Sequence, residues 1–161
     1  MTPEADPLVG VWRRDHDFAA RLGIGAHITV RNPFLSPDEW DVEAIRGLLR
    51  PFLPLTVTLD RLEDREGALV IIGEPYRELR KITDAVTARW PSLPPDTRDV
   101  LGPAYHMTIV RTPDPAIRSE AAAALGPKPP FQVPVRGVMA ADVEPSGVLR
   151  ALRAIDTGEV D

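Results

Sequence analysis

Two short segments of this sequence repeat the same residue types in the same order. One is residues 26–31, Ala-His-Ile-Thr-Val-Arg, and the other is residues 105–111, Tyr-His-Met-Thr-Ile-Val-Arg. In each, a threonine follows the histidine by two positions, and an arginine and then a proline come after it. The chain has three histidines, and two of them, His27 and His106, lie in this context about half a chain apart. These two segments are therefore the first candidates for a functional site.

The pattern predicts a specific chemistry. Both segments alternate β-branched or apolar residues with polar ones, which predicts strands. Residues i and i+2 of a strand share a face, so His27 projects with Thr29, and His106 with Thr108. Imidazole titrates near neutral pH, so one ring can act as base and the other as acid, while hydroxyls can donate to phosphate oxygens. An acid and a base on opposite sides of one phosphorus suit in-line phosphodiester cleavage or its reversal.

Three neighbouring residues are weaker candidates. Arg31 shares the expected face of the first motif and could bind phosphate, although the pattern favours a solvated or ion-paired residue at the end of the strand. Tyr105 precedes the second motif and could stack on a base. Arg111 has the opposite face parity from His106, so we expect it to be structural unless the strand bulges.

The sequence predicts the elements that would hold these residues. Proline, glycine and capping signals divide the chain, and hydrophobic periodicity assigns each piece. We expect helices over 7–14, 36–51, 75–90 and 114–124, strands over 26–31, 55–62, 68–72 and 105–110, and one or two strands within 131–143. The periodicity of residues 148–155 fits a helix, whereas the turn before them fits a hairpin. Antiparallel hairpins mixed with helices predict an α+β fold, and residues 1–161 are expected to form one domain.

Composition excludes several classes of protein. The 161 residues are 43% hydrophobic and 27% charged, with a net charge of −5, which argues against binding a long nucleic-acid duplex. No apolar run is long enough to span a membrane, and the acidic N-terminus shows no leader, so we expect a cytoplasmic protein without a membrane partner. Cysteine is absent, and no histidine spacing supports a three-histidine site that adds His16, so we expect no metal and no cofactor.

The paired His-x-Thr motifs resemble the two-histidine phosphoesterase superfamily, in particular its 2′-5′ RNA ligase and cyclic phosphodiesterase branch. The resemblance implies a bilobal fold: two pseudo-symmetric antiparallel sheets, helices outside them and a central groove holding both motifs. It also implies metal-independent chemistry with His27 and His106 as the acid/base pair and Thr29 and Thr108 as phosphate binders. The chain departs from the family's usual pattern at Arg31, and it starts at a helix where members usually have a preceding strand.

We therefore expect an enzyme that hydrolyses a 2′,3′-cyclic phosphate, or that cleaves or joins a 2′-5′ linkage. Its partner would be a small nucleotide or an RNA end, and the protein would be a monomer. The pseudo-symmetry does not decide which histidine is the base, although we favour His106 for that role and His27 for the acid. The direction of the reaction is also left open. The alternative is a non-catalytic module that binds nucleotides or RNA ends in the same groove.

Overall fold

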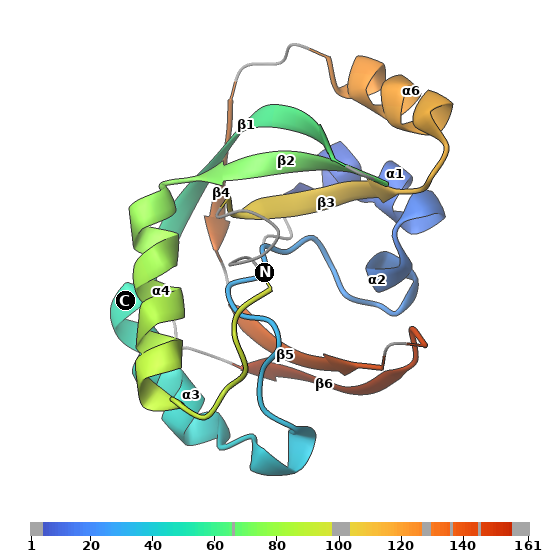
Figure 1. Ribbon diagram of the computed structural model, residues 1–161. Helices are drawn as coiled ribbons and strands as arrows, with labels where there is room; N and C mark the ends of the chain where they lie inside the picture. The colour runs from blue at the N-terminus through green and yellow to red at the C-terminus, as the bar shows by residue number, and fades with distance from the viewer. Residues whose placement is uncertain are drawn as a thin grey trace.

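The computed structural model describes residues 5–65, 67–97, 104–126, 130–135, 137–144 and 146–155. These residues form two antiparallel sheets with helices packed around them, which confirms the α+β prediction (Figure 1). The larger sheet has the strand order β3-β2-β1-β4, and the smaller one pairs β5 with β6. The strands are β1 (Leu55–Arg65), β2 (Ala68–Glu74), β3 (His106–Arg111), β4 (Phe131–Val135), β5 (Val138–Val143) and β6 (Leu149–Ile155).

The centre of the larger sheet is the predicted hairpin of β1 and β2. β1 alternates between buried residues such as Val57 and Leu59 and more exposed polar ones, as expected for a strand with one face on a core. β2 is apolar and buried along almost its whole length. Gly67 has a φ of 73° in the turn between them, a conformation that glycine adopts without strain. Residue 66, the other half of the predicted turn, lies outside the described residues, as do the first four residues on which the leader prediction depends.

Helices cover the sheets in two groups. In the first group, α1 (Asp6–His16) packs on β3 and α6 (Pro115–Leu125) packs on β2, while the short α2 (Phe18–Arg21) follows α1 (Figure 1). In the second group, α3 (Val42–Leu49) and α4 (Tyr76–Arg89) contact each other, and α3 also contacts β6. The two groups correspond to two hydrophobic clusters, one centred on the larger sheet and one between α3, α4 and the β5–β6 pair.

One predicted helix is divided into separate pieces. The expected capping box is present, since the Glu39 carboxylate accepts from the Ser36 backbone N–H at 3.1 Å, but it closes only the 3₁₀ turn η2 (Pro37–Glu39). The α-helix α3 begins afterwards, where the Asp41 side chain caps the Ala44 N–H at 3.0 Å. A second 3₁₀ turn, η3 (Arg50–Phe52), follows α3. Two capping signals in succession thus gave the appearance of one longer helix.

The C-terminal half resolves the segment that periodicity left open. Residues 149–155 form β6, which pairs antiparallel with β5 from Val138 opposite Ile155 to Val143 opposite Leu149. The turn signal before the segment was therefore the better guide.

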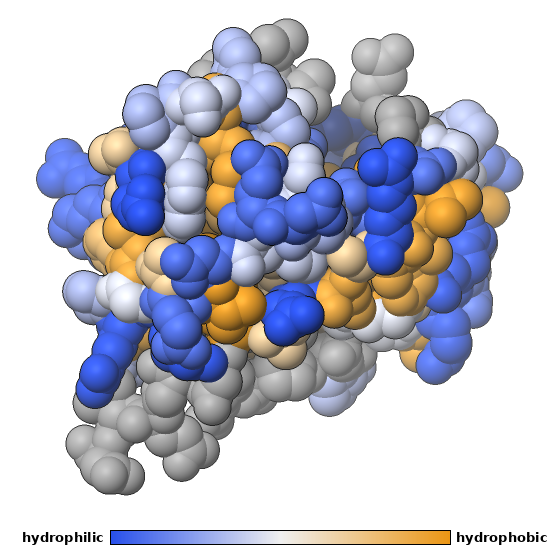
Figure 2. Space-filling view, turned by 90° about the horizontal axis from the view of Figure 1, so that it is seen from below, coloured by the Kyte–Doolittle hydropathy of each residue, from blue (hydrophilic) through white to orange (hydrophobic). Residues whose placement is uncertain are grey.

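Figure 2 shows apolar groups interspersed with charged ones on the face seen from below. In the described residues, no helix is long and apolar enough to cross a membrane.

The predicted strand over residues 26–31 is wrong. This segment has no regular secondary structure, and in the described part of the chain β5 pairs only with β6. A strand needs a neighbouring backbone with which to exchange hydrogen bonds. The alternating residues of the first motif therefore pack as an irregular segment rather than as part of a sheet.

Candidate active site

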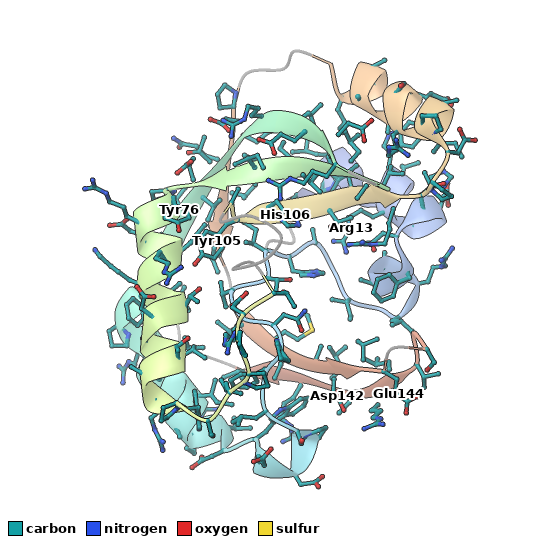
Figure 3. The ribbon with its side chains drawn as sticks, in the orientation of Figure 1. Arg13, Tyr76, Tyr105, His106, Asp142 and Glu144 are labelled. Carbon is teal, nitrogen blue, oxygen red and sulfur yellow. The ribbon has the colours of Figure 1, made fainter. Side chains whose placement is uncertain are left out.

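The second motif lies at the start of an edge strand of the larger sheet. In β3, His106 is directly opposite Ile72 of β2, and Thr108 is opposite Val70. Opposite residues of an antiparallel pair project from the same face, so the two motif side chains share a face above the apolar residues of β2. Figure 3 shows His106 at the beginning of β3. The predicted pairing of this histidine with its threonine on one face is confirmed.

A β-bulge brings a third residue to this face. The register shifts between Leu69 and Val70, so that Val110 is opposite Leu69 and Arg111 is opposite Ala68. Ala68 and Val70 share a face, which places Arg111 on the same face as Thr108. The bulge allows both Ile109 and Val110 to be fully buried in the core. In the sequence, the bulge corresponds to two consecutive apolar residues, Ile109 and Val110, before the arginine.

Side chains from other elements hold the first motif in place. Arg13 of α1 donates to the carbonyl oxygen of Ile24 at 3.2 Å, and Ala26 is buried beside the larger sheet. The Ile28 side chain packs over β2 at Gly73, where a Cβ would lie 2.8 Å from Ile28 Cδ1. Glycine at position 73 thus allows the segment around His27 to approach the sheet closely.

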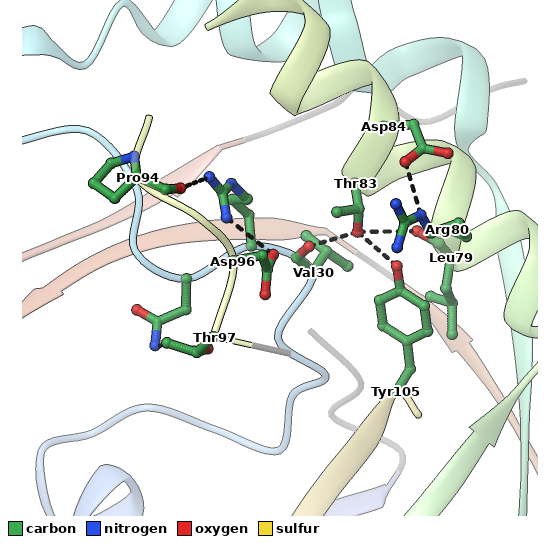
Figure 4. Close-up of polar contacts among 11 residues, drawn as sticks. Val30, Leu79, Arg80, Thr83, Asp84, Pro94, Asp96, Thr97 and Tyr105 are labelled. Carbon is green, nitrogen blue, oxygen red and sulfur yellow. Dashed lines mark hydrogen bonds and ion pairs between the residues drawn. The ribbon is translucent and has the colours of Figure 1, made fainter. Parts of the chain in front are cut away.

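Both motifs belong to one core. The residues flanking His27, Ala26 and Ile28, contact the same hydrophobic cluster as Tyr105 and Met107, which flank His106. A threonine of α4 also joins the two segments: the Thr83 hydroxyl lies 2.6 Å from the Val30 carbonyl oxygen and 2.6 Å from the Tyr105 hydroxyl (Figure 4). A carbonyl oxygen only accepts, so Thr83 donates to Val30 and Tyr105 donates to Thr83.

The two histidines have matching hydrogen bonds on one side of the ring. His27 Nδ1 lies 2.8 Å from the carbonyl oxygen of Gly25, and His106 Nδ1 lies 3.2 Å from that of Ala104. In both cases the partner is two residues earlier in the chain. A carbonyl next to Nδ1 favours the tautomer with its proton on Nδ1, which leaves the Nε2 lone pair for proton transfer.

Among the described residues, His106 Nδ1 has a second neighbour besides its carbonyl partner. Arg65 of β1 places Nη1 3.4 Å from His106 Nδ1, and its guanidinium is held by Glu63 at 2.9 Å. An arginine N–H only donates, so His106 Nδ1 either donates to Ala104 or accepts from Arg65. Arg65 therefore gives His106 Nδ1 a second possible hydrogen-bond partner, on the side of the ring away from Nε2.

The environment of His27 disfavours its charged form. Burial is the main cause that lowers the pKa of His27 below its ordinary value of 6.5, and the Arg13 charge acts in the same direction. The Gly25 carbonyl and Asp17 oppose this shift without overcoming it. In the free protein, His27 is therefore neutral at neutral pH.

This shift is measurable by NMR. We expect the His27 imidazole signals to titrate with a pKa below 6.5 in the free protein, because water is partly excluded from the ring. Between that pKa and 6.5 the unfolded chain binds more protons at this position, so this residue makes the protein more stable as the pH rises. Assignment by comparison with a His27→Gln spectrum identifies the signal, and a pKa at or above 6.5 would contradict the burial of the ring.

A cavity of about 700 Å³ adjoins the first motif. Ile24 and residues 27–35 form one wall, and the β5–β6 hairpin contributes Met139, Asp142 and Glu144, the last two labelled in Figure 3. His27 and Thr29 line the cavity, most of whose wall is apolar, and none of the described second-motif residues does so. Its volume is that of a small-molecule site.

Among the described residues, no three histidine or carboxylate side chains gather in a way that could hold a metal ion.

The structure gives the two other sequence-predicted substrate contacts partners within the protein. Arg31 is buried, forms an ion pair with Asp96 at 3.2 Å and donates to the Pro94 carbonyl oxygen, so it ties the 94–96 loop to the first motif (Figure 4). Tyr105 is only 2% exposed, with its ring tilted against Tyr76 and its hydroxyl bonded to Thr83. Internal partners therefore close Tyr105 to a ligand. They also hold the Arg31 guanidinium at the 94–96 loop, although Arg31 still lines the cavity beside His27.

The fold and the motifs together define a class. Two antiparallel sheets with helices around them and two His-x-Thr segments attached to one core are the features of the two-histidine phosphoesterases. The sequence matches the 2′-5′ RNA ligase superfamily over residues 2–154, and the chain therefore belongs to this superfamily. No curated protein matches the chain. The family resemblance noted in the sequence is thereby confirmed over nearly the whole chain.

Proposed function

We propose that this protein is a metal-independent phosphoesterase acting on a 2′,3′-cyclic phosphate or a 2′-5′ phosphodiester. The observation that carries the proposal is the matched pair of histidines. Each has its Nδ1 beside the carbonyl oxygen of the residue two positions earlier, a contact that favours the tautomer with its lone pair on Nε2 and so suits both rings for proton transfer. Binding a ligand alone does not need two titrating rings with this arrangement.

Three side chains supply donors for the phosphate in this proposal. Thr29 is exposed at the cavity, and Thr108 shares the face of His106. Arg111, on the same face because of the bulge, adds a guanidinium that suits bidentate binding of phosphate oxygens. These donors would stabilise the negative charge that develops on the non-bridging oxygens in the transition state.

The division of roles depends on the charge of His27. With His106 as the base and His27 as the acid, His27 must be protonated when the substrate is bound. Burial opposes this in the free protein, whereas a phosphate anion beside the ring favours the charged form. The substrate itself would therefore charge the acid, and the apolar cavity next to His27 would receive the base of the nucleotide.

The proposal is tested by turnover of defined substrates. Purified protein is incubated with the four 2′,3′-cyclic nucleotides, a 2′-5′ dinucleotide and a pair of RNA halves, each with and without EDTA. We expect turnover of at least one substrate at a rate that EDTA does not change, because the acid, the base and the phosphate donors all come from side chains. Binding without turnover of any substrate would instead indicate the non-catalytic module. Loss of activity in EDTA that zinc or magnesium restores would contradict the metal-independent mechanism.

A further inference from the structure

The sheet face that carries the second motif continues onto a row of charged residues. β1 pairs with the other edge of β2. There Arg61 is opposite Ile72, Glu63 is opposite Val70, and Arg65 is opposite Ala68. Directly opposite residues share a face, so these three side chains project on the same side as His106 and Thr108. We call Arg61, Glu63 and Arg65 the β1 row. It lies two strand spacings, about 10 Å, from the strand of the second motif.

The β1 row is a connected unit that reaches the histidine. Glu63 accepts from Arg61 Nε at 3.1 Å and from Arg65 Nη2 at 2.9 Å, and Arg65 Nη1 lies 3.4 Å from His106 Nδ1. The hydrogen bond with Arg65 is the main cause that lowers the pKa of Glu63, so this carboxylate stays ionised and holds both guanidiniums. Arg65 contacts the Nδ1 side of the ring, the side away from Nε2.

The row has unused capacity for an anion. The Arg61 side chain is 58% exposed and that of Arg65 is 29% exposed. Within the described part of the chain, the terminal Nη groups of Arg61 make no hydrogen bond. With Arg111 included, this stretch of the face has three arginines and one glutamate, a net charge of +2 on a protein whose net charge is −5. Glu74, the next residue on this face beyond Ile72, turns its carboxylate to the Tyr76 N–H.

We propose that the β1 row binds the phosphodiester backbone of an RNA strand whose terminal phosphate occupies the histidine site, so that the preferred substrate is an oligonucleotide rather than a mononucleotide. This proposal rests on the proposed function, because it identifies the substrate class of the same site. Guanidiniums arranged in a row on one face suit successive phosphates along a chain. The short apolar residues of β2 separate this row from the second motif.

The test compares one substitution on two substrates. In Arg61→Glu, KM for an oligoribonucleotide ending in a 2′,3′-cyclic phosphate should rise about tenfold more than KM for a 2′,3′-cyclic mononucleotide, because the mononucleotide has no further phosphate for Arg61 to bind. The matched control is Arg80→Glu, because Arg80 is a comparably exposed arginine paired with a single carboxylate, on α4. An equal effect on both substrates, or none on the oligonucleotide, would overturn the proposal.

A binding measurement separates this proposal from the proposed function. Fluorescence anisotropy with a labelled oligoribonucleotide ending in a 2′-phosphate needs no turnover, and we expect Arg61→Glu to weaken binding about tenfold and to reduce its dependence on salt. If the protein turns over no substrate yet shows this loss, the β1 row is supported and the proposed activity fails. Unchanged binding in an active protein overturns the β1 row alone. Competition by polyglutamate as effective as that by unlabelled RNA would also overturn it, because the row would then bind acidic chains in general.

Discussion

His27→Ala and His106→Ala are each expected to lower kcat about 10²–10⁴-fold, the usual contribution of one general acid or base. The unchanged protein should show a bell-shaped dependence of rate on pH, since one ring must be neutral and the other charged. Each alanine variant should lose one limb of this profile as well as most of the rate. Steady-state kinetics across pH 5–9 on the best substrate from the panel gives both measurements.

The third histidine provides the matched control. His16 lies at the end of α1, stacked on Trp12 with ring centroids 6.1 Å apart, and among the described residues it makes no hydrogen bond or ion pair with either motif. His16→Ala should therefore keep the rate and both limbs of the profile. If His27→Ala retains full activity on every substrate that the unchanged protein turns over, the assignment of His27 is wrong.

The second large effect concerns stability. Asp17→Ala is expected to lower the free energy of unfolding by about 3–5 kcal/mol, because it leaves the Arg13 guanidinium buried without its counter-charge. The two side chains are each only 2% exposed, and Asp17 Oδ2 lies 2.8 Å from Arg13 Nη2. Asp17 also caps α2 through the Ala19 N–H at 3.2 Å, which adds to the loss. Urea unfolding followed by circular dichroism measures the change.

An exposed pair with the same spacing isolates the effect of burial. Arg80 and Asp84 of α4 are also four residues apart and 2.7 Å from each other, but their side chains are 47% and 57% exposed. Asp84→Ala should cost less than about 1 kcal/mol, because water solvates the arginine that remains. An Asp17→Ala variant no less stable than Asp84→Ala would show that the buried charge of Arg13 is compensated in some other way.

Local sequence patterns predicted most of the fold. β1, β2, β3, α4 and α6 all appear where alternation, helical periodicity and capping residues place them. These signals act over a few residues, and within each of these elements they all predicted the same secondary structure. The family resemblance then supplied an expectation that local signals cannot give, namely that segments half a chain apart belong to one site.

Local patterns gave no sign of the internal partners of two candidate residues. Arg31 and Tyr105 were candidate substrate contacts because they lie beside the motifs. The partner of Arg31, Asp96, lies 65 residues later in the chain, and the partner of Tyr105, Thr83, lies 22 residues earlier. Sequence distance gives no indication of such pairings. The strand expected over residues 26–31 failed for a similar reason, since pairing depends on a neighbouring backbone and not on the alternation of its own side chains.

The bulge in β3 also bears on how the two motifs are related by descent. The arginine follows the histidine by four positions in the first motif, at Arg31, and by five in the second, at Arg111. If the motifs derive from one duplicated ancestral segment, one copy has gained or lost a residue. The bulge absorbs that residue, so an insertion that would invert an ordinary strand leaves Arg111 facing the same way as Thr108. The two copies are therefore best aligned with a one-residue gap after the threonine, and length variation at that point in homologues is compatible with an unchanged site.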